Sequence, residues 1–203
     1  MTAISKEEQA AMPVEFKLNG RDVVGHANET IIQTAKRYGV EIPHLCYMEG
    51  MRPDGNCRAC MVEVKGERVL APSCCRKAAA GMEVFTDNAR SLASQKMVLE
   101  LLLSDIPKRR YTLNSELDRW AAKLKVGKPR FAPRHQPLAD LSHTGIAVNL
   151  DHCIQCTRCV RACREEQVND VIGYAFRGEH SKIVFDFDDP MGASTCVACG
   201  ECV

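Results

Sequence analysis

The sequence carries no excess of charge of either sign and no long hydrophobic run. Its 203 residues include 27 Lys and Arg against 26 Asp and Glu, which gives a formal net charge of +1. Nucleic-acid-binding domains usually carry a clear basic excess, and a membrane-spanning helix needs about 18 or more apolar residues in succession. The most apolar stretch, residues 97–103, is interrupted by Glu100 and followed by Ser104 and Asp105. We therefore expect neither a nucleic-acid partner nor a membrane partner.

An export signal is also missing from residues 1–13. This segment contains Lys6, Glu7 and Glu8 but no apolar core and no twin arginine, whereas a signal peptide needs an apolar stretch of about 7–15 residues. We expect a mobile leader over residues 1–13 and a cytoplasmic protein.

Cysteine, in contrast, is abundant. Of 12 cysteines, five lie between Cys46 and Cys75, seven lie between Cys153 and Cys202, and none lies between these two groups. Because cytoplasmic thiols are kept reduced, such a density indicates metal or redox chemistry rather than disulfides. The gap predicts two separate cysteine-bearing domains.

The first part of the chain has the pattern of a small α+β domain. Apolar residues alternate with polar ones from Val14 to Leu18, Asn19-Gly20 is a favoured hairpin turn, and Val23 and Val24 continue into a second strand.

A helix and a second hairpin are predicted to complete this domain. Asn28 is a suitable cap for a helix that begins at Glu29 and ends at Gly39. A second hairpin is predicted from 61–64, through Lys65-Gly66, to 68–71.

The remaining chain is predicted to contain two core-packing helices, a linker and a second domain. The helices cover 91–103 and 113–125, and the proline-rich, basic stretch 127–137 is expected to be extended or to lie over a partner. Residues 182–187 are predicted to form a strand with Ile183, Phe185 and Phe187 on one face. The resulting domains are 1–13 (leader), 14–90, 91–147 (helices and linker) and 148–203.

The C-terminal cysteines follow the spacing of bacterial ferredoxins. Cys153, Cys156, Cys159 and Cys163 form a C-x2-C-x2-C-x3-C motif, whose fourth cysteine binds a neighbouring cluster. A second copy starts at Cys196, which predicts two [4Fe-4S] clusters with crossed ligands. One set is Cys163, Cys196, Cys199 and Cys202; the other is Cys153, Cys156, Cys159 and a cysteine expected at position 206. We therefore expect a longer polypeptide of which this sequence is the front part.

The N-terminal cysteines indicate a [2Fe-2S] site of the plant type, although the first spacing is longer than usual. The proposed ligands are Cys46, Cys57, Cys60 and Cys74. Cys75 is the alternative to Cys74 as the fourth ligand, but the spacing favours Cys74.

Cations near the cysteines can offset the negative charge of such clusters. Four arginines lie within or beside the binding loops, and each is alternatively a solvated surface residue: Arg58, Arg158, Arg161 and Arg164. His44 and His152 flank cluster cysteines, but a Rieske site needs two histidines on one iron. We expect both histidines to be surface residues or neighbours of ligands. A zinc site does not require two repeats of three cysteines at C-x2-C-x2-C spacing. Disulfides explain this spacing less well than zinc does.

Four motifs resemble a known family. They lie at 42–46, 52–64, 153–165 and 194–202, with sequences IPHLC, RPDGNCRACMVEV, CIQCTRCVRACRE and STCVACGEC. The sequence from residue 14 to 203 resembles the N-terminal part of the alpha subunit of NAD-dependent molybdenum or tungsten formate dehydrogenases. Segments similar to this part of the alpha subunit occur in the large iron-sulfur subunit of complex I and in hydrogenases. The resemblance implies a [2Fe-2S] ferredoxin-like (β-grasp) domain, a helical linker and an incomplete 2[4Fe-4S] ferredoxin domain.

The family's functional parts beyond these clusters lie outside this sequence. The resemblance implies that formate is oxidised at a bis-molybdopterin molybdenum or tungsten centre downstream. Electrons then pass through the clusters to a beta subunit that carries FMN and NAD. The chain would thus be part of an enzyme without supplying a catalytic residue.

One cysteine motif that many relatives carry is missing here, and its absence bears on which member of the family we expect. Many relatives have His-Pro and three further cysteines after the leucine-rich helix, and residues 103–110 contain neither a histidine nor a cysteine. We expect that additional cluster to be absent, which favours a formate dehydrogenase over complex I and the hydrogenases. The alternatives are a stand-alone iron-sulfur carrier of an NAD-linked hydrogenase or diaphorase complex, and a colourless zinc-stabilised interaction module.

Overall fold

The computed structural model of the protein describes residues 12–106 and 115–203. Most of the predicted leader, the start of the predicted helix 113–125 and residues 107–110 of the stretch that lacks the cysteine motif lie outside the described ranges. Within these ranges, no helix is both long and apolar enough to cross a membrane.

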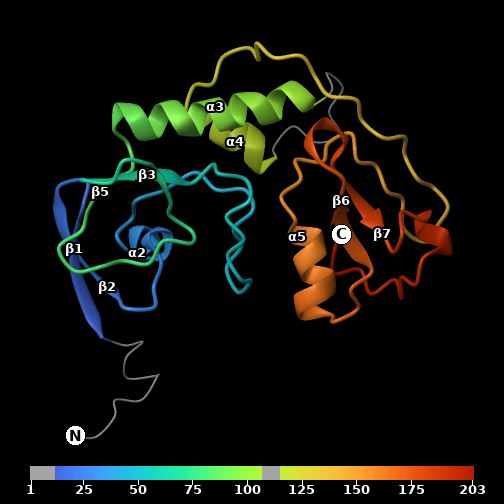
Figure 1. The fold of residues 1–203 in the computed structure, drawn as a ribbon, viewed down its shortest axis with the longest axis horizontal. Coiled ribbons are helices and arrows are strands. Elements are labelled where there is room, and N and C mark those ends of the chain that lie inside the picture. The colour runs from blue at the N-terminus through green and yellow to red at the C-terminus, as the bar shows by residue number, and fades with distance from the viewer. Residues whose placement is uncertain (1–11, 107–114) are drawn as a thin grey trace, which may run out of the picture.

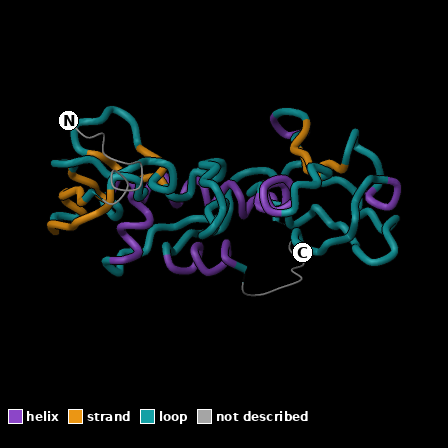
Figure 2. Tube along the Cα trace, turned by 90° about the horizontal axis from the view of Figure 1, so that it is seen from below, coloured by secondary structure: helices purple, strands orange, loops and turns teal. Residues whose placement is uncertain are grey.

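The described residues form two lobes. Figure 1 shows the strand-rich N-terminal lobe at one end and the C-terminal lobe at the other, with helix α3 (Ala89–Asp105) running above the N-terminal lobe toward the C-terminal lobe and α4 (Glu116–Lys123) beneath it. The perpendicular view in Figure 2 shows the same elongated arrangement, with strands gathered at one end and loops prevailing at the other.

The first predicted hairpin is confirmed. Strands β1 (Pro13–Leu18) and β2 (Arg21–His26) pair antiparallel with Leu18 opposite Arg21. Asn19 and Gly20 have φ values of 51° and 79°. Two successive left-handed residues give the turn that matches the natural twist of a hairpin.

The N-terminal lobe is a mixed five-stranded sheet with the order β2-β1-β5-β3-β4. Strand β5 (Glu83–Phe85) pairs parallel with β1 and antiparallel with β3 (Met61–Val64). Strand β4 is only Ala71–Pro72. The prediction of a strand over 68–71 is therefore wrong except at Ala71, because residues 65–66 form a turn and residues 68–69 a bend instead. The core under the sheet contains Phe16, Leu18, Ile31, Val62 and Val84.

Helix α2 (Ile31–Arg37) begins two residues later than predicted. Its N-cap is Thr30, whose backbone N–H donates to Gln33 Oε1 at 2.9 Å. Asn28 instead accepts from Lys77 Nζ at 2.9 Å. The prediction from Asn28 is wrong because a cap with a partner three residues later, Thr30 with Gln33, competes for the same helix start.

Helices α3 (Ala89–Asp105) and α4 (Glu116–Lys123) are capped by Asn88 and Ser115. Their buried residues Leu99 and Leu117 pack with Leu45, next to a cysteine of the N-terminal set. The two predicted helices therefore brace the lobe at its cysteine-bearing loops.

The predicted linker is extended, and it lies over this chain's own helix α3 (Figure 1). Arg130 Nε and Nη2 donate to the Glu100 carboxylate at 2.7 and 2.8 Å. This pair holds the pKa of Glu100 below its ordinary value. The backbone N–H of Arg134 donates to Asp105 Oδ1 at 3.0 Å.

The C-terminal lobe contains helix α5 (Arg158–Arg161), which continues into a π-helical turn, η1 (Ala162–Glu166). Strands β6 (Ile172–Ala175) and β7 (Lys182–Phe185) pair antiparallel. Two short 3-10 turns, η2 and η3, cover Gly178–His180 and Met191–Ala193.

The strand predicted over 182–187 ends early. Ile183 and Phe185 are buried, but Phe187 is 98% exposed. Asp186 and Asp188 have φ values of 46° and 77°, which end the extended conformation, so the alternation that placed Phe187 on the buried face does not continue.

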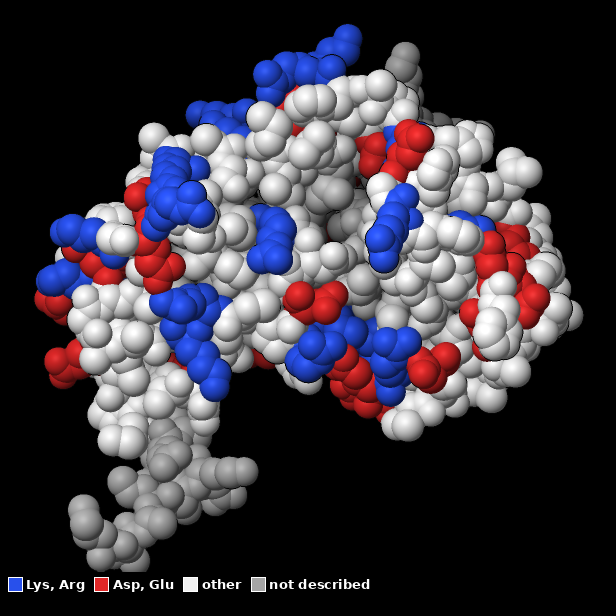
Figure 3. All heavy atoms as spheres, viewed as in Figure 1, with Lys and Arg blue, Asp and Glu red and all other residues white. Residues whose placement is uncertain are grey.

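Basic and acidic side chains are interspersed over the face drawn in Figure 3. Several are close ion pairs, such as Lys65 with Glu83 at 2.6 Å. This mixed surface agrees with the formal net charge of +1.

Gln95 joins helix α3 to the sheet, and it is 1% exposed. Its Nε2 donates to the Met61 and Thr86 carbonyls at 2.9 and 3.1 Å. Gln95→Met removes this donor from both carbonyls, so we expect a loss of about 2 kcal/mol in local stability. Hydrogen exchange of the α3 and β3 amides measures this loss. Lys96→Met, at the exposed neighbouring position, is the control and should change exchange little; equal effects would contradict the role of Gln95.

Candidate metal centres

Four cysteines converge in the N-terminal lobe: Cys46, Cys57, Cys60 and Cys74. We call them the N-terminal cysteine group. Cys60 directly precedes β3 and Cys74 follows β4, so the β3–β4 pairing brings them together. Cys46, Cys60 and Cys74 are 0–1% exposed, and Cys57 is half-buried.

The sulfur atoms of this group interact with one another. The backbone N–H groups of Cys46 and Cys57 donate to each other's Sγ at 3.4 and 3.5 Å. Hydrogen bonds from Cys57 and Cys74 lower the pKa of the Cys46 thiol. A hydrogen bond with Cys74 lowers the pKa of Cys60, and the same hydrogen bonds raise the pKa values of Cys57 and Cys74. Hydrogen bonds therefore link the four thiols to one another.

Cys75 lies on the outside of this group. It is exposed, and its Sγ is 3.6 Å from Cys74 Sγ. It also lies against Gly55, where an added Cβ would be 2.8 Å from Cys75 Sγ. Gly55 has a φ of +64°, so the loop needs a glycine here for its backbone conformation and for this close approach.

The two C-terminal cysteine repeats have the same local geometry. In Cys153–Cys156, the N–H of Gln155 donates to Cys153 Sγ at 3.4 Å. In Cys196–Cys199, the N–H of Ala198 donates to Cys196 Sγ at 3.4 Å. Gln155 and Ala198 both have left-handed φ values, 54° and 55°. Each repeat thus turns its backbone amides inward toward sulfur, as a thiolate-bound metal core requires.

The first C-terminal set consists of Cys153, Cys156 and Cys159. Burial raises the pKa of Cys159 to about 12, and the nearby Cys156 and Cys153 raise it as well. Burial and Cys156 raise the pKa of Cys153. We call these three residues the proximal cysteine set.

The second set joins Cys163 to the later repeat. Burial raises the pKa of Cys202, and Cys196, Cys199 and Cys163 add to this effect in that order. The same four cysteines line one small hollow in the C-terminal lobe. Cys163 therefore lies with the distant repeat rather than with the three cysteines that precede it, and we call these four the distal cysteine set.

The four candidate arginines differ in environment. Arg58 and Arg164 are exposed, so they are solvated surface residues. Arg158 is half-buried, and Arg161 is 3% exposed. His44 contacts the Ile42 carbonyl through Nδ1 at 2.8 Å.

His152 contacts Asp151 through Nδ1 at 2.7 Å. His44 and His152 are half-buried neighbours of cysteine-bearing loops rather than members of a cysteine group.

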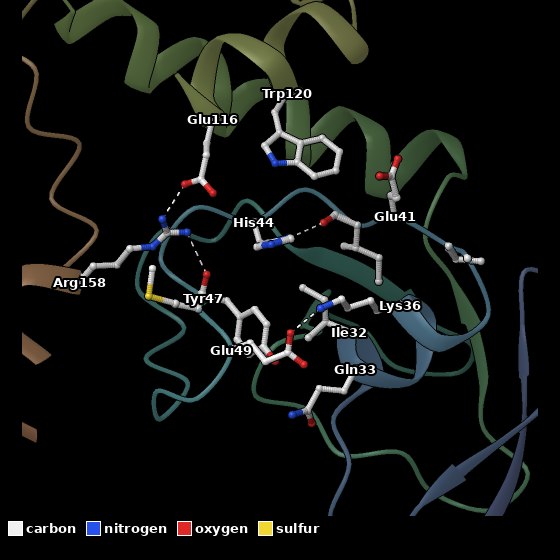
Figure 4. A pocket seen from close by; sticks show the side chains of 14 residues that line it. Ile32, Gln33, Lys36, Glu41, His44, Tyr47, Glu49, Glu116, Trp120 and Arg158 are labelled. Carbon is white, nitrogen blue, oxygen red and sulfur yellow. Dashed lines mark hydrogen bonds and ion pairs between the residues drawn. The ribbon is translucent and has the colours of Figure 1, made fainter. Parts of the chain in front are cut away.

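A cavity beside the Cys46 loop is not part of these centres. Figure 4 shows His44, Tyr47 and Trp120 around it, with Arg158 reaching between Glu116 and Tyr47. The Arg158 guanidinium donates to Glu116 Oε2 at 2.6 Å and to the Tyr47 carbonyl at 2.9 Å. No cysteine is among the described residues that line this cavity.

The loop that carries the N-terminal group is hydrogen-bonded to the loop that carries the proximal set. Asn56 Nδ2 donates to the Gln155 carbonyl at 2.5 Å, and the Thr157 hydroxyl donates to Asp54 at 2.5 Å. Arg52 pairs with Glu165 at 3.0 Å. Sequence reasoning missed these residues, because their partners lie about 100 positions away and no local pattern marks them.

The donor sets fit iron-sulfur clusters. Within residues 12–106 and 115–203, no three His, Cys, Asp or Glu side chains converge closely enough to hold a single metal ion. A cluster needs a wider arrangement, because its thiolates are distributed over two or four iron atoms. All donors in the N-terminal group and the two sets are sulfur, and backbone amides point at several of them.

The environments of Cys74 and Cys75 generate a test. Because Cys74 lies among the converging sulfur atoms and Cys75 outside them, Cys74→Ser is expected to abolish or reshape the [2Fe-2S] EPR signal of the reduced protein. Cys75→Ser is the matched control and should leave it unchanged. Loss of the signal in Cys75→Ser alone would mean that the fourth ligand is Cys75.

Comparison with protein families agrees with this geometry. Residues 11–89 match the model of a 2Fe-2S iron-sulfur cluster binding domain. Residues 144–195 match the ferredoxin-like domain of NADH-quinone oxidoreductase subunit 3.

Individual relatives come from several oxidoreductases. The chain is 32% identical to NADP-reducing hydrogenase subunit HndD of Solidesulfovibrio fructosivorans over 92% of its own length and 34% of the relative. It is 28% identical to "Putative formate dehydrogenase SH0748" of Staphylococcus haemolyticus, covering 91% of this chain and 19% of the relative. It is 33% identical to a subunit of NADH-quinone oxidoreductase from Rhizobium meliloti, covering 94% of this chain and 23% of the relative. The chain thus spans 19–34% of the lengths of these curated relatives.

A solved structure shares most of the fold. A chain of the NAD+-reducing [NiFe]-hydrogenase, crystallised in its H2-reduced state, superposes with a TM-score of 0.82 at 25% identity, covering 91% of this chain and 80% of that chain. The two cysteine-bearing segments thus match iron-sulfur and ferredoxin-like domain models, and the chain is similar to subunits of NADH-quinone oxidoreductase and of hydrogenases.

Proposed function

We propose that this chain is the electron-transfer part of a larger NAD-linked oxidoreductase and holds a row of iron-sulfur clusters. The observation that carries the proposal is the bonding between the loop of the N-terminal cysteine group and the loop of the proximal set. Two separate carriers in one chain would not need their cysteine loops in contact. Electron transfer between them does need short distances.

The proposed ligands follow the groups described above. Cys46, Cys57, Cys60 and Cys74 would hold a [2Fe-2S] cluster. Cys163, Cys196, Cys199 and Cys202 would hold one [4Fe-4S] cluster, and the proximal set would supply three ligands of another. The corresponding domains are proposed as 14–90 and 148–203, joined by 91–147.

The clusters, when bound, supply one-electron acceptance and release. The protein's own residues hold the sulfur donors and, in the N-terminal group, bury most of them. Cys46 and Cys74 are fully buried. The amides of Gln155 and Ala198 donate to sulfur, and such hydrogen bonds stabilise negative charge on thiolates.

The ligand groups generate a pair of variants with opposite expected results. Cys57→Ser should remove or alter the [2Fe-2S] EPR signal and leave the [4Fe-4S] signals, because its sulfur lies in the N-terminal group. Cys163→Ser should damage a [4Fe-4S] signal and leave the [2Fe-2S] signal. EPR of reduced protein, with iron analysis, distinguishes them. The reverse pattern would contradict the proposed groups.

The specific complex we propose is a formate dehydrogenase of the molybdenum or tungsten class. The motif set, and the lack of histidine and cysteine over 103–110, support this choice. The similarity to a formate dehydrogenase named in Staphylococcus haemolyticus supports it too. The bis-molybdopterin centre would lie outside this chain, and the flavin and NAD would belong to a partner subunit.

The second candidate is a subunit of an NAD-linked hydrogenase. It is favoured by the solved hydrogenase chain, of which this chain covers 80% at a TM-score of 0.82. In that case the chain would pass electrons between hydrogen and NAD sites on other subunits.

Substrate tests on the native complex separate the two candidates. The complex that contains this chain is purified anaerobically and offered formate or hydrogen, with NAD as the acceptor. Formate-dependent NADH formation, together with molybdenum or tungsten in the metal analysis, is the expected outcome. Reduction of NAD by hydrogen but never by formate would overturn the formate proposal and support the hydrogenase candidate.

A further inference from the structure

Arg161 is a buried cation whose described side-chain partners are backbone carbonyls. It is 3% exposed, and its guanidinium donates to two backbone carbonyls. One bond joins Nη1 to the Arg52 carbonyl at 2.8 Å, and the other joins Nη2 to the Cys46 carbonyl. Its Nε is buried and has no hydrogen-bond partner among the described residues. A buried charge without a nearby anion is costly.

Three nearby arginines form ion pairs with carboxylates. Arg158 pairs with Glu116 at 2.6 Å, Arg164 pairs with Asp170 at 2.5 Å, and Arg52 pairs with Glu165 at 3.0 Å. Within the part of the chain that the structure describes, no ion pair joins Arg161 to a carboxylate. Among its described contacts, the charge of Arg161 is met by carbonyl oxygens and not by a carboxylate.

Arg161 lies next to cysteines of all three groups. It lies between Cys159 of the proximal set and Cys163 of the distal set, and its side chain bonds to the backbone of Cys46. All three cysteines belong to groups proposed to hold clusters. A cluster bound by four thiolates carries net negative charge, which increases when it accepts an electron.

We propose that Arg161 is a positioning residue that neutralises the buried negative charge between the cluster sites, fixes the Cys46 loop against helix α5, and thereby raises the reduction potential of the [2Fe-2S] site. This inference rests on the proposed function, because it requires clusters in these groups. The guanidinium favours the reduced, more negative state over the oxidised state. Its two carbonyl bonds keep the charge at a constant place between the lobes.

The test is a redox titration followed by EPR on the full chain in its cluster-loaded form. Arg161→Gln removes the charge and keeps a hydrogen-bonding side chain. We expect the equilibrium for reducing the [2Fe-2S] site to become about tenfold less favourable, which is a fall of about 59 mV for a one-electron couple. Arg161→Lys keeps the charge but loses the two-pronged contact, so its potential should stay near that of the unaltered protein.

Arg164→Gln is the matched control, because Arg164 is exposed and paired with Asp170. It should leave the potential unchanged. Equal shifts in Arg161→Gln and Arg164→Gln, an unchanged potential in Arg161→Gln, or a fall in Arg161→Lys as large as in Arg161→Gln would each overturn the inference. If Arg161→Gln does not fold, Arg161→Met, which removes the charge and keeps the aliphatic part of the side chain, takes its place with the same expected fall and the same control.

Measurements on the unaltered protein distinguish a failure of this inference from a failure of the proposed function. Absence of any iron-sulfur EPR signal in the unaltered chain would refute the proposed function. Normal signals whose potentials do not respond to loss of the Arg161 charge would refute only the role of Arg161.

Discussion

The contact between the 46–57 loop and the 153–161 segment is the interaction on which the arrangement of the molecule depends. It is made by polar groups that meet backbone carbonyls, including Arg158 with Tyr47 and Arg161 with Cys46. Guanidinium groups suit this task because they present several donors in a rigid plane. Without these bonds, fewer described contacts would hold the two lobes together, and the distances between their cysteine groups would be less firmly set.

Burial and hydrogen bonding act together around the cysteines. The N-terminal group is closed by the sheet and by the Leu45–Leu99–Leu117 cluster, which places polar sulfur atoms next to a dry core. Sulfur in such a place needs donors, and the backbone N–H groups of Cys46 and Cys57 supply them. In the C-terminal lobe, the cysteine loops supply backbone amides by adopting left-handed conformations at Gln155 and Ala198. Ordinarily these conformations cost energy for residues with a side chain. Here the cost is offset by the hydrogen bonds that the turned amides make.

The comparisons link one module to several oxidoreductases. Relatives named for hydrogenase, formate dehydrogenase and NADH-quinone oxidoreductase activities each share the same stretch, and this chain is only 19–34% of their length. Electron transfer needs only closely spaced redox centres in a fixed frame, so the same frame is compatible with different catalytic domains. Under the proposed function, substrate identity would be set by other parts of the complex, whereas this chain would set the distances between its cysteine groups.

Local features of this protein followed from the sequence alone. The Asn19-Gly20 hairpin and the mixed α+β character of the first lobe depend on short-range turn chemistry and apolar periodicity, which a sequence displays directly. Cysteine spacing also led to the proposed ligand groups, since it limits which sulfur atoms can surround one core. Where two local signals competed, as for Asn28 and Thr30 at the start of α2, or where aspartates ended a strand before Phe187, sequence reasoning chose wrongly. Tertiary structure alone decided that Arg161 is buried between the lobes while Arg164, three residues later, is exposed. Both have the same chemistry and the same motif, and only the packing of α5 against a loop about 110 residues earlier makes them different.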